Sequence, residues 1–208
     1  MRLERRETTA AAVSSLALLG VFIGGVSTNY LYPALSAVLG IGLTLVPLLL
    51  RRFANIPLPW SLTAFAGAVT FLHAFGILAY LYDLIWWWDI MTHISATAVM
   101  AAGITVGLIM IGEMRPRLSF LNEHLPLVVL GLVIVAGVLW EVLEFIFDGV
   151  LGMNMQYSLD DTATDLTFDI LGGALVIVLV PPYLPGLRRS YVQLRKEFLA
   201  ETEAGEMG

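Results

Sequence analysis

The sequence predicts an all-α polytopic membrane protein, built as a bundle of six transmembrane helices. Of its 208 residues 58% are hydrophobic and only 13% are charged, and the mean hydropathy is +0.83. This leaves too little polar surface to cover a soluble globule of this size. Six apolar runs are each close to the length of about 20 residues that a helix needs to cross a bilayer. Every Lys and Arg lies outside these runs.

We place each helix at an apolar run that lies between polar or Pro-containing segments. We expect helices near residues 10–28, 31–50, 59–81, 88–111, 125–147 and 162–184. The first run follows three arginines, as a signal peptide would, but no convincing cleavage site follows it, so we expect it to stay as the first helix. The helices then form one transmembrane domain over residues 1–187, followed by a charged cytoplasmic tail over residues 188–208.

The positions of the basic residues predict the orientation. All 11 lie on one side of a bundle with an even number of helices: Arg2, Arg5, Arg6, Arg51, Arg52, Arg115, Arg117, Arg188, Arg189, Arg195 and Lys196. Because cytoplasmic segments carry the excess of Lys and Arg, both termini should be cytoplasmic. The protein is therefore expected to be a multi-pass protein of the cell membrane, with the lipid bilayer as its surroundings.

Charge and cysteine content exclude several functions. The chain has 17 acidic residues against 11 basic ones, so nucleic acid is not an expected partner. It has no cysteine, which excludes disulfides, thiolate metal sites and a cysteine nucleophile. No serine is evident as a nucleophile beside a general base either.

Nine of the 17 acidic residues lie on the side without basic residues, and the other eight share the basic side. The nine are Asp83 and Asp89, together with seven acids of the fifth and sixth helices and the segment between them: Glu141, Glu144, Asp148, Asp160, Asp161, Asp165 and Asp169. A carboxylate within the bilayer costs roughly 2.5 to 3.5 kcal/mol on an insertion scale, so several of them need a common reason. We expect them to bind a cation or to be partly protonated.

Helical spacing brings several of these groups onto shared faces. Asp89 and His93 are four residues apart, Glu141 and Glu144 are three apart, and Asp165 and Asp169 are four apart. Each pair therefore lies on one face of its helix. We expect the three pairs at similar depth, with Asp169 roughly 12 Å below the outer boundary at about 1.5 Å per residue.

Carboxylates and a histidine from several helices are the ligands that metal sites in helical bundles use. We therefore expect a divalent metal ion, either Mg²⁺, Mn²⁺, Ca²⁺ or Zn²⁺, open to the extracytoplasmic side. Its candidate ligands are Asp89, His93, Glu141, Glu144, Asp165 and Asp169. In an enzyme, Glu141 and Glu144 are the candidate catalytic bases, and the metal would activate water to hydrolyse a lipid-type substrate. Neither the Glu-x-x-His pairs of di-iron bundles nor the His-Glu-x-x-His motif of zinc proteases is present.

Other interpretations remain open at this point. Buried acids and histidines also form cation or proton pathways, which a transporter would use, and a structural subunit could use the acids to bind a basic partner. Asp148, Asp160 and Asp161 could be solvated, and Asp161 could cap the sixth helix. Whether His73 or Asp161 joins the site is also open.

The aromatic run at Trp86, Trp87 and Trp88, with Tyr80 and Tyr82, is typical of an aromatic belt at the membrane interface.

Three motifs resemble those of a known family. They are Asp89-Ile-Met-Thr-His93, Trp140-Glu141, and Asp161-Thr162-Ala163-Thr164-Asp165-Leu166 followed by Gly172-Gly173-Ala174. Over about residues 80–175 the chain resembles the YjdF-like integral membrane proteins, which typically show Asp-x-x-x-His-Phe, a Glu beside a Trp, and Trp-Asp-Thr-Gln-x-Asp-Met before a Gly-Ala pair. Ile94 replaces the Phe, Asp160 the Trp and Ala163 the Gln. The resemblance implies a multi-helix membrane fold in which the three segments form one unit, and it implies no particular reaction.

Overall fold

The computed structural model consists of helices throughout its described residues and contains no strand there. It describes residues 2–54, 58–114, 116–118, 120–153, 155–156 and 158–179, with scattered positions between 185 and 200. The elements are α1 (Arg2–Ser27), α2 (Leu31–Ala54), α3 (Trp60–Leu78), α4 (Leu81–Leu84), α5 (Trp88–Met114), the 3-10 turn η1 (Pro116–Leu118), α6 (Phe120–Glu123), α7 (Leu125–Leu151) and α8 (Leu159–Leu179). Six of these helices are long and apolar enough to cross a membrane, which confirms the predicted fold class.

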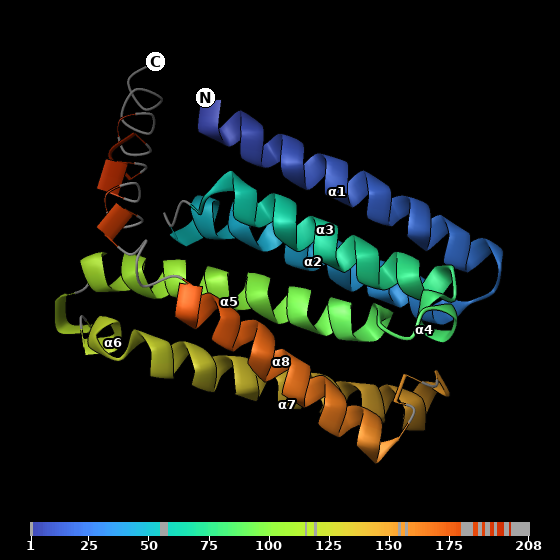
Figure 1. The fold of residues 1–208 in the computed structure, drawn as a ribbon. Helices are drawn as coiled ribbons and strands as arrows, with labels where there is room; N and C mark the ends of the chain where they lie inside the picture. The colour runs from blue at the N-terminus through green and yellow to red at the C-terminus, as the bar shows by residue number, and fades with distance from the viewer. Residues whose placement is uncertain are drawn as a thin grey trace.

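The six long helices pack as two groups of three (Figure 1). In the first group α1, α2 and α3 contact one another, and in the second α5 contacts α7 and α8; α3 packs against α5 and joins the groups. Each group has its own apolar core, around Leu18 and Ala74 in the first and around Ala101 and Val133 in the second. The α1–α2 turn, α4 and the start of α8 lie at one end of the bundle, which we call the α4 end, and α6 lies at the other.

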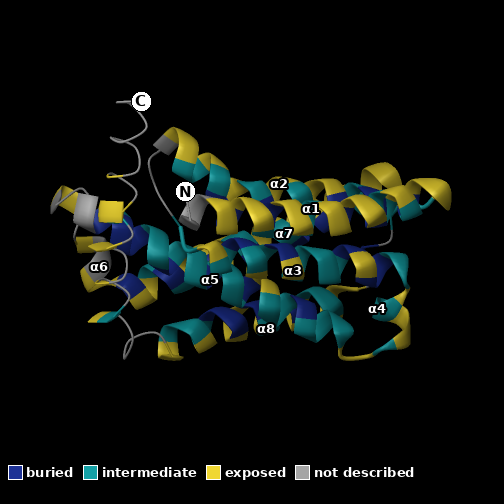
Figure 2. Cartoon of the chain, turned by 90° about the horizontal axis from the view of Figure 1, so that it is seen from above, coloured by how far each residue is buried: buried dark blue, intermediate teal, exposed yellow. Residues whose placement is uncertain are grey.

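Residues that face outward are largely exposed and apolar, as lipid requires. In Figure 2 exposed residues follow the outer sides of α1 and α2, while buried ones turn toward the other helices. Leu16, Phe65 and Leu127 are among the exposed apolar side chains. A partly buried ion pair at the opposite end from α4, between Glu7 and Arg51 at 3.1 Å, connects α1 to α2. Arg51 thus lies within α2, whereas the sequence placed it after the second helix.

The helix boundaries differ from the expected ones around the acidic segment. The fifth long helix, α7, continues to Leu151 and ends at Gly152, whose left-handed φ of 62° suits a residue without a Cβ. The sixth, α8, starts at Leu159 instead of residue 162, because the Ser158 hydroxyl accepts a hydrogen bond from the Asp161 N–H and caps the helix. Residues 180–184 of the predicted sixth helix, and most of the predicted tail over 188–208, lie outside the described residues.

Asp148 connects the end of α7 to the start of α8. Its two carboxylate oxygens accept hydrogen bonds from the backbone N–H groups of Met155, at 2.6 Å, and Gln156, at 2.8 Å. The Gln156 side chain in turn donates to the Thr162 hydroxyl of α8, at 2.5 Å. Asp148 therefore has a structural role within the turn, and it is not simply a solvated acid.

Replacing Asp148 with alanine should loosen this turn and destabilise the bundle. The change removes two hydrogen bonds to a charged acceptor, each worth about 1.5–3 kcal/mol, so we expect the free energy of unfolding to fall by about 2 kcal/mol or more. Thermal unfolding in detergent measures the loss, and limited proteolysis between residues 152 and 158 reports the opening. Asp160→Ala, at an exposed position on α8, is the control. Equal stability of the two variants would contradict this role.

Candidate metal centre

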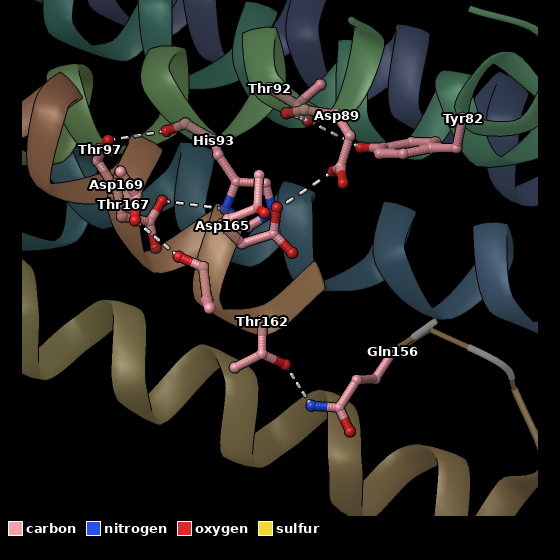
Figure 3. A network of polar contacts seen from close by, with 12 residues as sticks. Tyr82, Asp89, Thr92, His93, Thr97, Gln156, Thr162, Asp165, Thr167 and Asp169 are labelled. Carbon is pink, nitrogen blue, oxygen red and sulfur yellow. Dashed lines mark hydrogen bonds and ion pairs between the residues drawn. The ribbon is translucent and has the colours of Figure 1, made fainter. Parts of the chain in front are cut away.

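His93 lies at the centre of the acidic cluster, one turn into α5. Its Nε2 atom is 3.5 Å from Asp89 Oδ1 and 3.8 Å from Asp165 Oδ1, and its Nδ1 atom is 3.0 Å from Asp169 Oδ1. Figure 3 shows the imidazole between these carboxylates. Asp89 reaches it from the same helix, four residues earlier, and the other two reach it from α8, where they are also four residues apart. The expected spacing on each helix therefore brings the side chains together.

Glycines let α8 approach closely enough for these contacts. A Cβ at Gly172 would meet the Thr97 hydroxyl and would lie 2.6 Å from the carbonyl oxygen of Ile94, both on α5. On α7, a Cβ at Gly137 would lie 2.7 Å from Asp169 Oδ2. The positions of α5, α7 and α8 around His93 thus depend on the absence of side chains at these crossings.

Three of the predicted ligands offer atoms close enough to share one ion. One ligand atom from each of Asp89, His93 and Asp165 lies within 4.8 Å of the other two. Atoms that bind one metal at about 2.0–2.2 Å lie at most about 4.4 Å apart, so a small adjustment of the side chains suffices. Asp165 is buried, with 3% of its surface exposed, whereas Asp89 and His93 are partly exposed. The group is thus fixed on its inner side and accessible on its outer side.

Asp169 and the two glutamates occupy different places around this group. Asp169 hydrogen bonds to the ring nitrogen that faces away from Asp89 and Asp165. Glu144 is buried and lines the same cavity as the three-residue group. Glu141 is buried as well but is not among the residues that line the cavity. The cluster predicted from the sequence is thus arranged in layers, with different neighbours for each acid.

A cavity of about 140 Å³ connects the cluster to the α4 end. This volume has room for several water molecules. From the second group of helices and their turn it is lined by Asp89, His93, Glu144, Met155, Asp161 and Asp165. From the first group, its turns and α4 it is lined by Tyr30, Tyr32, His73, Tyr80, Tyr82 and Asp83. Both residues whose membership the sequence left open, His73 and Asp161, therefore line the cavity. Burial raises the pKa of Tyr30, so its hydroxyl group is uncharged at neutral pH.

A hydrogen-bonded chain in the cavity wall was not predicted. Thr92 donates to the carbonyl oxygen of Asp89 at 2.8 Å and accepts from the Tyr82 hydroxyl at 3.2 Å. The Tyr82 oxygen must then accept from Nδ1 of His73, at 2.7 Å, so that nitrogen carries a hydrogen atom. Tyr82 thus supports the start of α5 and is not simply a belt residue, whereas Trp86 and Trp87 are exposed as a belt requires. Sequence spacing could not reveal this series of hydrogen bonds, because Tyr80 turns the backbone at a left-handed φ of 56° and folds α4 back.

Comparison with known proteins places the chain in a family. A family model described as "Predicted membrane protein (DUF2238)" matches residues 9–185. The chain belongs to the DUF2238 family. The matched residues include α1 from residue 9 onward, the whole of the other five long helices, and every predicted site residue.

The family match comes with one curated relative. An uncharacterized protein of Thermotoga maritima is 30% identical over 128 residues, which are 61% of this chain and 65% of that protein. The match therefore spans less than two thirds of that relative's length. No solved structure matches the chain.

Proposed function

We propose that this DUF2238 protein binds one divalent cation between Asp89, Nε2 of His93 and Asp165. The observation that carries the proposal is the convergence of their three ligand atoms within 4.8 Å of one another at the wall of a cavity. Two oxygens and one imidazole nitrogen suit Mn²⁺ or Zn²⁺ better than Ca²⁺, which takes oxygen ligands alone. Water in the cavity would complete the coordination.

The position of Asp169 supports this assignment. It hydrogen bonds to Nδ1 of His93, which leaves Nε2 directed at Asp89 and Asp165. Histidines that bind metals usually donate their second ring N–H to a carboxylate, which fixes the tautomer and the orientation of the ring. We therefore assign Asp169 to orienting His93, in place of the direct ligation that the sequence favoured.

The charge of the site also favours a bound cation. Between residues 53 and 187 the only basic residues other than histidine are Arg115 and Arg117. Arg117 lies in η1, next to α6, at the end of the bundle opposite the cavity. The buried acids of the cluster therefore have no Lys or Arg beside them among the described residues, and a divalent ion supplies the missing positive charge.

We propose that the bound ion activates water for hydrolysis of a lipid-type substrate. The cation would lower the pKa of a bound water. A nearby carboxylate would accept the proton of this water as it attacks an ester or phosphoester, and would return the proton to the alcohol that leaves when that bond breaks. Glu144 is the candidate for this base, because it is buried and lines the cavity. A lipid in contact with the apolar outer surface of the helices could reach the cavity at the α4 end. The resemblance to the YjdF-like proteins rests on motifs that include Asp89, His93 and Asp165, so we expect those proteins to share the site.

The orientation of the protein in the membrane and the opening of the cavity to one side complete the proposal. With both termini cytoplasmic, as the basic residues predict, the α4 end and its cavity face the extracytoplasmic side. Toward the α6 end, the second group is filled by an apolar core that includes Leu108, Ile109, Leu125 and Val129. This packing favours a site open to one side, as in an enzyme, over a pathway through the membrane.

Substituting Asp165 with asparagine tests the cation site. The variant keeps the shape of the side chain and removes the buried negative charge, so we expect at least about a tenfold loss of Mn²⁺ affinity. Asp160→Asn is the matched control, with the same chemical change at an exposed position on the same helix. Purified protein is dialysed against Mn²⁺ and its metal content is measured by mass spectrometry. Equal metal content in both variants and the wild type would exclude the proposed ligands.

The reaction is tested separately. Wild-type protein in vesicles of mixed phospholipids, loaded with Mn²⁺, should release lipid products that the Asp165→Asn protein does not. Uptake of Mn²⁺ into the vesicles without lipid products would show a transporter instead.

A further inference from the structure

Glu141 is the acid of the cluster whose two carboxylate oxygens are both buried without a hydrogen-bond partner among the described residues. It lies in α7 with 5% of its surface exposed. Neither of its carboxylate oxygens is accessible, and neither has a hydrogen-bond partner among the described residues. The Thr162 hydroxyl of α8 lies nearby, but outside hydrogen-bonding geometry. The carboxyl group is therefore enclosed by protein and separated from the cavity.

The charged groups around Glu141 are mostly acidic. Asp161, Asp165 and Asp169 face it from α8, Glu144 lies one turn away on its own helix, and His93 faces it from α5. His93 is the sole group among these that can carry positive charge, and three other carboxylates already contact it. No neighbour is therefore left to balance a negative charge on Glu141.

The proposed metal ion does not balance a negative charge on Glu141 either. Within the described residues, the one group of ligand atoms close enough to share an ion consists of Asp89, His93 and Asp165, without Glu141. A divalent ion there would balance Asp89 and Asp165, which leaves Glu141, Glu144 and Asp169 to be balanced by other means. An ionised carboxylate that is enclosed without partners is far less favourable than the neutral acid.

We propose that Glu141 is a proton-binding site, which holds its carboxyl group in the neutral, protonated form beside the cation site. This adds a second ligand, the proton, to a site for which the proposed function requires only a metal ion and a substrate. It also separates the two glutamates that the sequence treated alike: Glu144 faces the cavity as a base, and Glu141 carries a proton behind it in the helix.

Infrared difference spectroscopy of wild-type protein minus Glu141→Gln at neutral pH tests the proposal. We expect the carbonyl stretching band of a protonated carboxyl group, shifted when the protein is exchanged into D₂O. The control difference, wild type minus Asp160→Asn, should show carboxylate bands, because Asp160 is exposed. Carboxylate bands alone in the Glu141→Gln difference would overturn the proposal. A Glu141→Gln variant that fails to fold would also count against it, because glutamine matches the neutral acid in shape and charge.

Metal binding by the same variant gives an independent result. If Glu141 is neutral, Glu141→Gln leaves the charge of the site unchanged, and its Mn²⁺ affinity should stay within about threefold of the wild type. A loss of tenfold or more would show that Glu141 is ionised and binds the metal directly. Wild-type protein without any bound metal would refute the proposed function, whereas the infrared result would still decide whether Glu141 carries a proton.

Discussion

Replacing His93 with alanine should weaken Mn²⁺ binding by about 100-fold or more. The imidazole supplies the nitrogen that lies between Asp89 and Asp165, at 3.5 and 3.8 Å. Loss of a carboxylate that merely orients a metal-binding histidine typically costs 10- to 100-fold in affinity, so loss of the ligand itself should cost at least as much. Calorimetric titration of purified protein with Mn²⁺ measures the change.

Asp169→Asn is the matched comparison for this experiment. It leaves Nε2 in place and weakens the hydrogen bond to Nδ1, so we expect a loss of about 10- to 100-fold. In the double variant the Asp169 effect should disappear, because no imidazole remains to be oriented. Additive effects of the two substitutions would contradict the orienting role. Unchanged Mn²⁺ affinity in His93→Ala would show that Mn²⁺ binds elsewhere and that the contacts of His93 are ion pairs only.

Replacing Gly172 with alanine should separate α8 from α5 and damage both stability and metal binding. The added Cβ would lie 2.6 Å from the carbonyl oxygen and 3.1 Å from the Cα of Ile94. Because these are backbone atoms, the helix has to move, and overpacking of this kind typically costs about 1–3 kcal/mol. Asp169 lies one turn from Gly172 and Ile94 is next to His93, so the same movement should lengthen the contact between Asp169 and His93.

Thermal unfolding in detergent and Mn²⁺ titration measure the two effects of Gly172→Ala. Gly131→Ala is the control, since a Cβ there meets nothing within 4 Å and alanine favours a helix more than glycine does. We expect the control to be as stable as the wild type or more stable. A Gly172→Ala protein with unchanged unfolding temperature and metal affinity would show that the crossing can accommodate a larger residue.

Much of the cluster could be predicted because it depends on distances along single helices. Asp89 and His93 share a face, and so do Asp165 and Asp169, for any helix that contains them. The prediction that these groups lie at a common depth rested on helix length alone. The sequence left open whether Asp161 caps α8, whereas Ser158 performs this role, since helix ends depend on local turn geometry that composition does not fix.

The roles of the individual acids could not be predicted in the same way. Spacing placed Glu141 and Glu144 on one face of α7, but the rotation of that helix against α8 decides that Glu144 lines the cavity and that Glu141 is enclosed. Likewise, the contacts of Asp148 with the turn after α7 depend on the folded path of residues 152–158. Such roles depend on contacts between elements, and helical periodicity carries no information about those.

The sequence by itself determined that this is a six-helix membrane protein in which nine of the 17 acidic residues gather at the end away from the basic residues. Lipid imposes both features, because it demands long apolar helices and tolerates carboxylates only where other groups share their cost. Only the tertiary structure decided which carboxylate meets which nitrogen of His93. That choice depends on how closely glycines let α5, α7 and α8 approach, and this is a property of packing between helices and not of any one of them.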